Sequence, residues 1–391
     1  MNKNYKWLSI YCLILILMSS LFLSMVVVAS EGKIENMVLV SGSGMNRISL
    51  IDGNGDAAWE MFKGDISWEE VNDADMLSNG NVVFAARANS GSTVYMIKPN
   101  YAKKRGYDVV WSYQVPSDAE NHTCQVLPDG GILLCEAYAE YIRIVELDAD
   151  GQVRFTLGGQ DSPLEGWPKI SDRHGQVRQI HKTAEGTYLV ASMSTQKTFE
   201  YDANGKKLAE YAAGGFTAIK DRDGNVIVSG GSTNRITCFD AETKKVLWRI
   251  QQTDLEKENI TFGFIAAIEL KENGNLVFAN WGGHGGASGD AVMEVTLPTD
   301  EQRPQLVWSL NCGGSTSNVQ VIDHVDPAIF EGKTPAVTVG TENGDSATDD
   351  TIGSDDGSND QDAETALWWI LPIAVAVIVI VIVIVLRMKK K

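Results

Sequence analysis

Basic residues are scarce in this chain of 391 residues, in which 33 Lys and Arg stand against 51 Asp and Glu and the formal net charge is -18. No stripe of lysine and arginine runs through the part that we expect to fold, so we expect no nucleic-acid partner. The 37 glycines are scattered rather than periodic, which excludes a collagen-like chain. Because aromatic and β-branched residues are plentiful, the composition favours a turn-rich all-β fold.

Histidine and cysteine are also few, at five residues each. No His-x-x-x-His or Cys-x-x-Cys spacing occurs, so we expect no metal site. Cys124 and Cys135 flank one predicted hairpin. A two-residue turn at Asp129-Gly130 would place them opposite each other and allow a disulfide, whereas a three-residue turn would put them out of register. Both alternatives are open at this point.

Charge is absent from a long apolar run near the N-terminus, residues 7–28. The run follows two lysines and ends on small residues before Ser30, which predicts a signal peptide over residues 1–30. Because the run is long for a signal peptide, an uncleaved membrane anchor is the alternative.

Charge is absent again from residues 368–386, which would span roughly 28 Å as a helix. We therefore expect a transmembrane helix over 367–387, with the basic tail 388–391 in the cytoplasm and the rest of the chain outside the cell. Residues 332–366 are acidic, rich in Gly, Ser and Thr, and almost free of large apolar side chains, which predicts a disordered stalk. The folded domain is then expected over 31–331.

Within that domain one pattern recurs: a short apolar strand, a turn of the form (Asp/Asn/Glu)-Gly, and a second apolar strand. Each copy predicts a hairpin, because glycine accepts the positive φ that such a turn requires. The spacings of roughly 40 to 55 residues are typical of propeller blades. The hairpin glycines are Gly80, Gly130, Gly186, Gly224 and Gly274.

A third strand and then a fourth strand with an aromatic residue follow each hairpin. The third strands are expected at 48–51, 94–97, 142–145, 199–201, 236–239 and 292–295. The fourth-strand positions are Trp59, Trp111, Phe155, Trp248 and Trp308, with Leu208 where an aromatic would be expected. Six of each predict an all-β, six-bladed β-propeller. The strand 37–41 lacks a first strand and the strand 318–322 lacks a second, so their pairing would close the ring.

Residues 236–248, Ile-Thr-Cys-Phe-Asp-Ala-Glu-Thr-Lys-Lys-Val-Leu-Trp, resemble the pyrroloquinoline-quinone-type (PQQ-like) propeller repeat, in which Asp-x-x-(Thr)-Gly precedes a strand ending in Trp. Lys244 stands where that pattern has glycine, and residues 51–59 are a shorter version. The resemblance implies the propeller architecture. Quinone-binding dehydrogenases of that family are usually eight-bladed and use a vicinal cysteine pair, which this chain lacks, so we expect no cofactor.

Residues 121–134 are similar to the His-x-x-x-(Leu/Val)-Leu-Pro-(Asn/Asp)-Gly-Asn-(Ile/Val)-Leu hairpin of bacterial arylsulfotransferase-like propellers. That resemblance implies transfer of a sulfuryl group through a channel histidine, here His122, assisted by other His, Arg and Asn residues. Arg178 would be the arginine.

Counting eight residues back from the hairpin glycines places Asn72, His122 and Arg178 near the axis, at one mouth of the channel. Loops on the same side would add Trp281 and His284 to a ligand site rimmed by polar and aromatic groups. Other residues expected on that side are Trp68, Glu69, Glu70, Arg87, Glu136, His174 and Arg235. Such a grouping could bind an anion such as sulfate. The alternative is that these polar residues only hold water.

The sequence therefore predicts a membrane-anchored, extracellular propeller that binds a protein, glycan or small ligand, with no reaction assignable. Two enzymatic alternatives are a sulfuryl transferase that uses His122 and Arg178 and a quinone-dependent oxidoreductase. A third interpretation is a scaffold for partner complexes at the envelope.

Overall fold

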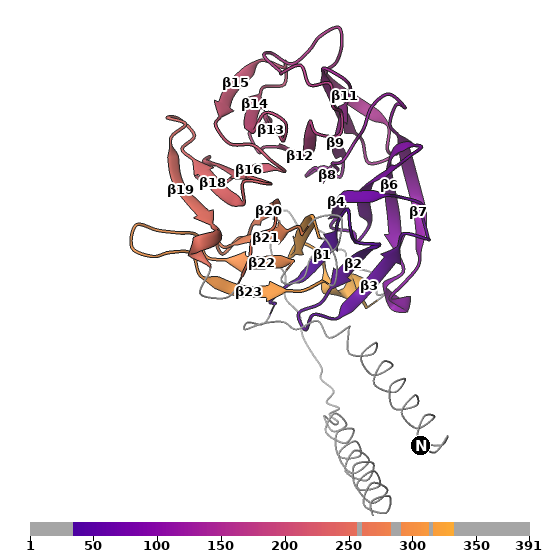
Figure 1. Cartoon of the computed structure of the whole chain (residues 1–391). Coiled ribbons are helices and arrows are strands. Elements are labelled where there is room, and N and C mark those ends of the chain that lie inside the picture. The colour runs from indigo at the N-terminus through magenta and orange to yellow at the C-terminus, as the bar shows by residue number, and fades with distance from the viewer. Residues whose placement is uncertain (1–33, 256–259, 283–290, 313–315, 332–391) are drawn as a thin grey trace, which may run out of the picture. The chain divides into compact units, whose positions relative to one another are not determined.

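The structure, a computed structural model, describes residues 34–255, 260–282, 291–312 and 316–331 (Figure 1). The predicted signal peptide, acidic stalk, transmembrane helix and basic tail lie outside these residues. Within the described ranges, no helix has both the length and the apolar character needed to cross a membrane.

Six antiparallel sheets of four strands each form the blades of a β-propeller, as expected (Figure 1). We number the blades from the N-terminus, so the first blade is the one that contains the N-terminal strand. In sheet order, the first blade is β24 (Asn318–Ile322), β1 (Met37–Ser41), β2 (Arg47–Ile51) and β3 (Ala57–Phe62); the second is β4 (Glu70–Met76), β5 (Val82–Ala88), β6 (Gly91–Pro99) and β7 (Tyr107–Gln114); the third is β8 (Gln125–Val126), β9 (Ile132–Ala137), β10 (Ile142–Leu147) and β11 (Val153–Gly158).

The other three blades are built in the same way. The fourth is β12 (Val177–Lys182), β13 (Tyr188–Ser192), β14 (Lys197–Tyr201) and β15 (Lys207–Tyr211); the fifth is β16 (Ala218–Lys220), β17 (Val226–Ser229), β18 (Arg235–Phe239) and β19 (Val246–Gln251); the sixth is β20 (Ile265–Leu270), β21 (Leu276–Asn280), β22 (Val292–Val295) and β23 (Leu306–Leu310). Short 3-10 helices, η2 (Tyr101–Lys103), η3 (Gln252–Asp254) and η5 (Pro327–Ile329), lie in the connections.

The ring closes through the first blade, which contains both ends of the folded chain. β24 pairs with β1 in antiparallel register, with Val38 opposite Val321. The prediction that strands 37–41 and 318–322 share a sheet is therefore confirmed. Because the closed ring leaves no blade without a neighbour, every sheet can bury both faces.

Fourth-strand tryptophans connect neighbouring blades. The Trp59 indole N–H donates to the Gly106 carbonyl at 3.0 Å, and the Trp111 indole N–H donates to the Ala149 carbonyl at 2.9 Å. Each acceptor lies in the turn before the fourth strand of the next blade. In these two blades the aromatic residue that marks the repeat links one blade to the next, whereas the Trp308 indole N–H donates to Glu294 Oε2 of its own blade at 2.5 Å.

Side chains on the inner strands make a second set of links across the channel wall. Asp75 accepts a hydrogen bond from the backbone N–H of Val126, and Gln125 accepts one from Lys182. Glu269 accepts in the same way from the N–H of Val321. Asp75, Gln125 and Glu269 each lie five residues before a hairpin glycine, so one repeat position performs this role in three blades.

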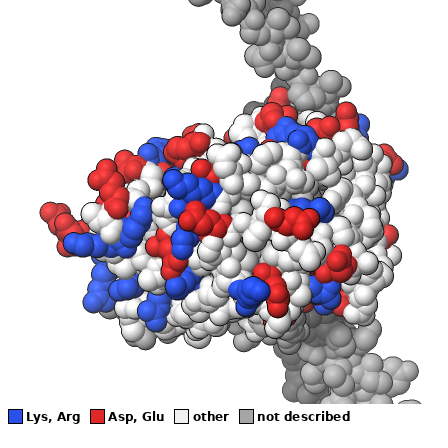
Figure 2. All heavy atoms as spheres, turned by 90° about the horizontal axis from the view of Figure 1, so that it is seen from above, with Lys and Arg blue, Asp and Glu red and all other residues white. Residues whose placement is uncertain are grey.

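Acidic and basic side chains are interspersed on the face shown in Figure 2, and no basic stripe crosses it.

Candidate functional site

Irregular pairing in the inner strands aims polar side chains into the channel. In β4 the register shifts around Asn72 and Asp73, and in β12 it shifts around Arg178 and Gln179. Each shift leaves these residues outside the ladder, as a β-bulge does, and a bulge redirects side chains. Consecutive polar residues at both places can therefore be buried near the axis.

His122 is positioned by the side chain of Asn121, which takes the place of missing ladder hydrogen bonds before β8. Asn121 Oδ1 accepts from the Cys135 backbone N–H at 3.2 Å, and its Nδ2 donates to the Thr123 carbonyl at 3.0 Å. His122 itself is only 2% exposed.

His174 lies on the connection between β11 and β12, which is held by buried residues. Trp167 is buried in the core between these blades and donates its indole N–H to Gln176 Oε1 at 3.2 Å. The backbone N–H of His174 donates to Asp172 Oδ1 at 3.1 Å, and Arg178 donates Nη1 to the His174 carbonyl. These contacts fix a histidine that no regular strand carries.

Six charged or ionisable side chains gather at one mouth of the channel, and we call them the mouth cluster. They come from the second, third and fourth blades and the connections before their inner strands: Glu70, Arg87, Glu120, His122, His174 and Arg178. Glu120 Oε2 lies 3.3 Å from His122 Nε2 and 3.0 Å from His174 Nδ1. Glu70 faces the other nitrogen of each ring, at 3.9 Å from His122 Nδ1 and 3.8 Å from His174 Nε2. The two imidazole rings therefore lie between two carboxylates.

Asn72 and Arg87 complete the contacts of the mouth cluster. Asn72 Nδ2 donates to Glu70 Oε2 at 2.9 Å and lies 3.1 Å from His122 Nδ1. Arg87 Nε lies 3.4 Å from Glu120 Oε2.

Paired charges keep both carboxylates of the mouth cluster ionised. Burial raises the pKa of Glu70, but interactions with His122, His174 and Arg178 and the hydrogen bond from Asn72 together outweigh it, so that pKa lies below its ordinary value. Hydrogen bonds from His122 and His174 lower the pKa of Glu120. Burial and the nearby Arg178 charge lower the pKa of His122 to about 4, so its ring is neutral at pH 7. Burial also lowers the pKa of Arg178 to about 10, which leaves it cationic.

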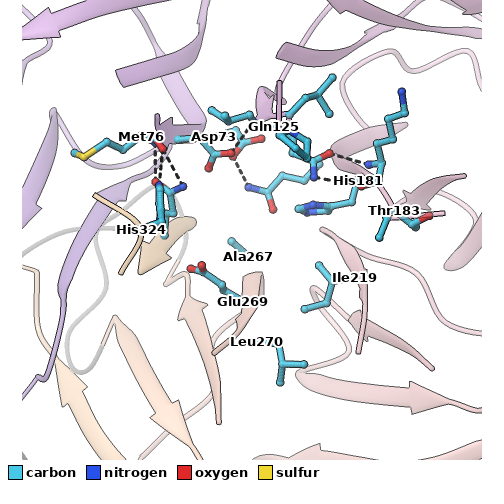
Figure 3. A pocket seen from close by; sticks show the side chains of 18 of the residues that line it. Asp73, Met76, Gln125, His181, Thr183, Ile219, Ala267, Glu269, Leu270 and His324 are labelled. Atoms are coloured by element: carbon cyan, nitrogen blue, oxygen red, sulfur yellow. Dashed lines mark hydrogen bonds between the residues drawn. The ribbon is translucent and has the colours of Figure 1, made fainter. Parts of the chain in front are cut away.

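A cavity of about 830 Å³ occupies the channel beyond the mouth cluster, further along the inner strands. We call it the channel cavity (Figure 3). It is lined by the inner strands of all six blades and by the hairpin turns that follow several of them. Its wall is part apolar, with Met76, Ile219 and Leu270, and part acidic, with Asp75 and Glu269.

A hydrogen-bonded layer spans the channel at the upper end of this cavity. Gln179 Nε2, from the fourth blade, donates to Asp73 Oδ1 at 2.8 Å and to Asn318 Oδ1 at 2.9 Å. Asp73 and Asn318 belong to the second and first blades, so one side chain connects strands far apart in the sequence.

Burial dominates the electrostatics of the acidic side chains in the channel cavity, although His324 acts on Asp75 and Lys271 on Glu269. Burial raises the pKa of Asp75 to about 6 and that of Glu269 to about 8, with the nearby Asp75 and Asp323 charges raising the latter further. Burial and the neighbouring Asp75 also raise the pKa of Asp73 well above its ordinary value. Lys271, which acts on Glu269 from a distance, forms its ion pair with Glu294 at 2.8 Å.

Basic residues at the rim of the channel cavity are paired with other acids. Lys182 Nζ lies 2.6 Å from Glu146 Oε1, and Lys220 Nζ lies 2.8 Å from Glu200 Oε1. Arg154 pairs with Asp129 and Glu146. The interior of the cavity is therefore its acidic part.

The structure brings together three of the five expected ligand-binding residues, Asn72, His122 and Arg178. Trp281 makes an edge contact with Phe264 at a ring-centroid distance of 5.2 Å. His284 lies outside the described residues. Glu70, Arg87 and His174, expected on the same side, belong to the mouth cluster.

Sequence reasoning missed Glu120 and the acids of the channel cavity. The position five residues before each hairpin glycine was a usable signal for two of them, Asp75 and Glu269, because it recurs with polar residues in several blades. Glu120 has no such repeat signal.

The structure corrects the expected disulfide. Cys124 and Cys135 are both free thiols. The hairpin has Gln125 opposite Leu133, and Leu127 N–H donates to the Gly131 carbonyl, so the turn contains three residues rather than two. The cysteines are consequently out of register, and they pack in two different core clusters.

Comparison with known proteins gives a family and a fold. The sequence model of a family described as Mal s 1 allergenic protein-like matches residues 46–287. A protein of unknown function from Bacteroides caccae has a solved structure similar to this one, with 25% identity and a TM-score of 0.60 over 73% of this chain and 97% of that chain. No curated protein matches the chain.

Two lyase structures are also similar, at lower scores. A streptogramin B lyase matches with 16% identity and a TM-score of 0.46, over 72% of this chain and 86% of that chain. A catalytically inactive virginiamycin B lyase from Staphylococcus aureus, with quinupristin, matches with 14% identity and a TM-score of 0.45, over 72% of this chain and 88% of that chain.

Proposed function

This chain belongs to the Mal s 1-like family, and we propose that it is a binding propeller, displayed outside the cell on a C-terminal membrane helix, that takes a small organic cation in its channel cavity. The anchoring part rests on the sequence alone: the apolar run within 367–387, the basic tail 388–391 and the signal peptide over 1–30.

The observation that carries the binding proposal is the only partly compensated acidity of the channel cavity. A cavity of about 830 Å³ is of a size to enclose most of a small ligand. Burial raises the pKa of Asp75 to about 6 and that of Glu269 to about 8, so Glu269 keeps at neutral pH a proton that a free carboxyl would release. His324 and Lys271 compensate this burial only in part. A ligand ammonium group would supply the remaining compensation, and the apolar wall formed by Ile219 and Leu270 would contact the rest of the ligand.

The same features count against the two enzymatic alternatives. Both ring nitrogens of His122 have partners, and Glu70 and Glu120 place negative charge where a sulfate oxygen would have to bind. Pyrroloquinoline quinone is itself a carboxylate, so the acidic interior of the channel cavity disfavours it. A cation-binding module fits the charges better than either enzyme.

Binding of phenethylammonium to the full-length chain tests the cavity proposal, with neutral 2-phenylethanol and anionic phenylacetate as comparators. We expect the cation alone to raise the melting temperature in a concentration-dependent way. The double variant Asp75→Asn/Glu269→Gln should lose that response, and Glu301→Gln, which alters an exposed acid outside the cavity, should keep it. Equal binding of phenylacetate, or a full response in the double variant, would contradict the proposal.

Truncation after residue 366 tests the anchoring part in an expressing cell. The shortened chain should appear in the medium, whereas the full-length chain should stay with the membrane fraction. Membrane retention of the truncated chain would contradict a C-terminal anchor.

A further inference from the structure

Three side chains of the mouth cluster present a metal-type donor set. The ligand atoms of Glu70, His122 and His174 all lie within 4.8 Å of one another. Donors around a tetrahedral zinc ion, at bond lengths of about 2.0–2.1 Å, lie roughly 3.4 Å apart. Glu70 Oε2 lies 3.9 Å from His122 Nδ1, and Glu70 Oε1 lies 3.8 Å from His174 Nε2. Because the three ligand atoms lie within 4.8 Å of one another, a closure of at most about 1.4 Å would bring them to that spacing.

Glu120 determines which nitrogen of each ring is free to bind an ion. An ionised carboxylate can only accept, so the nitrogens that contact it, His122 Nε2 and His174 Nδ1, carry the ring protons. When a ring is neutral, its lone pair therefore lies on His122 Nδ1 or on His174 Nε2. Both of these atoms face the Glu70 carboxylate, His122 Nδ1 on the side of Oε2 and His174 Nε2 on the side of Oε1.

Asn72 agrees with this proton assignment. Its Nδ2 can only donate, and it lies within hydrogen-bond distance of both Glu70 Oε2 and His122 Nδ1. Ser317 Oγ donates to its Oδ1 at 3.0 Å, which holds the amide in this orientation. Asn72 thus satisfies in part the acceptors that an ion would satisfy, and its amide must turn aside when an ion binds.

We propose that Glu70, His122 and His174 bind a divalent transition-metal ion of the zinc type, with Glu120 as the positioning residue for both rings. Two imidazoles and one carboxylate are the donor set of zinc sites that keep a coordination position open. A carboxylate that accepts the second N–H of a ligating histidine is the usual outer-shell partner in such sites.

The charges around the mouth cluster leave room for a divalent cation. Glu69, Glu70 and Glu120 surround Arg87, and Glu70, Glu120 and Asp172 act on Arg178. The neighbourhood has two more carboxylates than guanidinium groups, and an imidazole binds an ion in its neutral form. The His174 side chain is 35% exposed, so an ion can reach the donors from solvent.

Titration of the full-length chain, first stripped with a chelator, tests this proposal with Zn²⁺ and with Co²⁺ as a spectroscopic reporter. We expect one Zn²⁺ per chain, a Co²⁺ absorption spectrum typical of low coordination, and no competition from Mg²⁺ or Ca²⁺, which prefer all-oxygen ligands. His174→Ala should weaken Zn²⁺ binding by at least about 100-fold, and Glu120→Gln should weaken it about 10-fold and alter the Co²⁺ spectrum.

Glu69→Gln is the matched control, because it removes a neighbouring carboxylate that faces Arg87 rather than the two rings. It should bind Zn²⁺ within about threefold of the unaltered chain, since its charge lies outside the donor set and is screened by salt. His174 is the most exposed ligand, so His174→Ala is the variant expected to fold normally, and a circular dichroism spectrum checks this. Absence of Zn²⁺ binding, or unchanged binding in folded His174→Ala, would overturn the proposal. Neither result depends on the ligand of the channel cavity.

Discussion

The two ends of the channel treat buried carboxylates in opposite ways. In the mouth cluster, Glu70 and Glu120 have lowered pKa values, because histidine and arginine side chains surround them. In the channel cavity, Asp75 and Glu269 have raised pKa values, because burial outweighs the effects of His324 and Lys271 on them. β4 and β12 contribute side chains to both regions, so the difference comes from a few partner residues and not from the fold.

Because of this difference, the two ends of the channel should contribute to the stability of the folded chain with opposite pH dependences. Carboxylates with lowered pKa values stabilise the folded chain above their ordinary pKa, and that contribution is lost as the pH falls. Carboxyls with raised pKa values stabilise it most at low pH, and that contribution is lost as the pH rises. The hydrogen-bonded layer of Gln179, Asp73 and Asn318 lies between the mouth cluster and the channel cavity.

Removal of the buried cation is expected to have the largest effect. Arg178→Met, measured in chelator, should lower the free energy of unfolding by about 3 kcal/mol, because a buried charge that loses its partner stays desolvated without compensation. The mouth cluster would then resemble the channel cavity, with raised carboxyl pKa values. Urea denaturation at pH 7 measures the change.

The exposed Arg303 provides the control for this variant. Arg303→Met should change the free energy of unfolding by less than about 0.5 kcal/mol. A loss below about 1 kcal/mol in Arg178→Met would show that Arg178 does not hold the mouth carboxylates in their ionised state.

Removal of the layer between the two regions should have an intermediate effect. Gln179→Met keeps the length of the side chain but leaves the Asp73 and Asn318 oxygens without their donor, which should cost about 2 kcal/mol. Urea denaturation measures it, with the exposed Gln302→Met as control. A change below about 0.5 kcal/mol would mean that water replaces the Gln179 amide as the donor to the Asp73 and Asn318 oxygens.

The six blades and their closure could be predicted because they depend on local signals that repeat. Gly80 and Gly130 both adopt φ of +80° in their hairpin turns, and such a requirement is visible in a single sequence. Closure followed from two unpaired strands at the ends of the domain, which left only one arrangement without an open edge.

The site could be predicted in part, and the failures have physical causes. His122 and Arg178 were found because their distance from the hairpin glycine fixes how far along the inner strand they lie. Glu120 was missed because its importance depends on His174, which belongs to another blade. The disulfide failed because the residues around Asp129 allow a turn of two or three residues, and one residue decides the register.

Replacement of one cavity carboxyl should give the smallest change at low pH, and it tests the opposite end of the comparison. Glutamate in the unfolded chain ionises near its ordinary pKa of 4.5, whereas folded Glu269 keeps its proton until about pH 8. The folded state therefore binds more protons than the unfolded state between these values, and stability must fall as the pH rises through that window. Glu269→Gln cannot ionise but can still accept from the Val321 N–H, so it should lose this part of the pH dependence.

Because one pKa unit corresponds to about 1.4 kcal/mol, the variant should be more stable than the unaltered chain by at least about that amount at pH 8.5, and similar to it at pH 4.5. Urea denaturation at both values measures the difference, with Glu301→Gln as an exposed control. A variant that loses stability more steeply than the unaltered chain as the pH rises would show that Glu269 is ionised and compensated, as the carboxylates of the mouth cluster are.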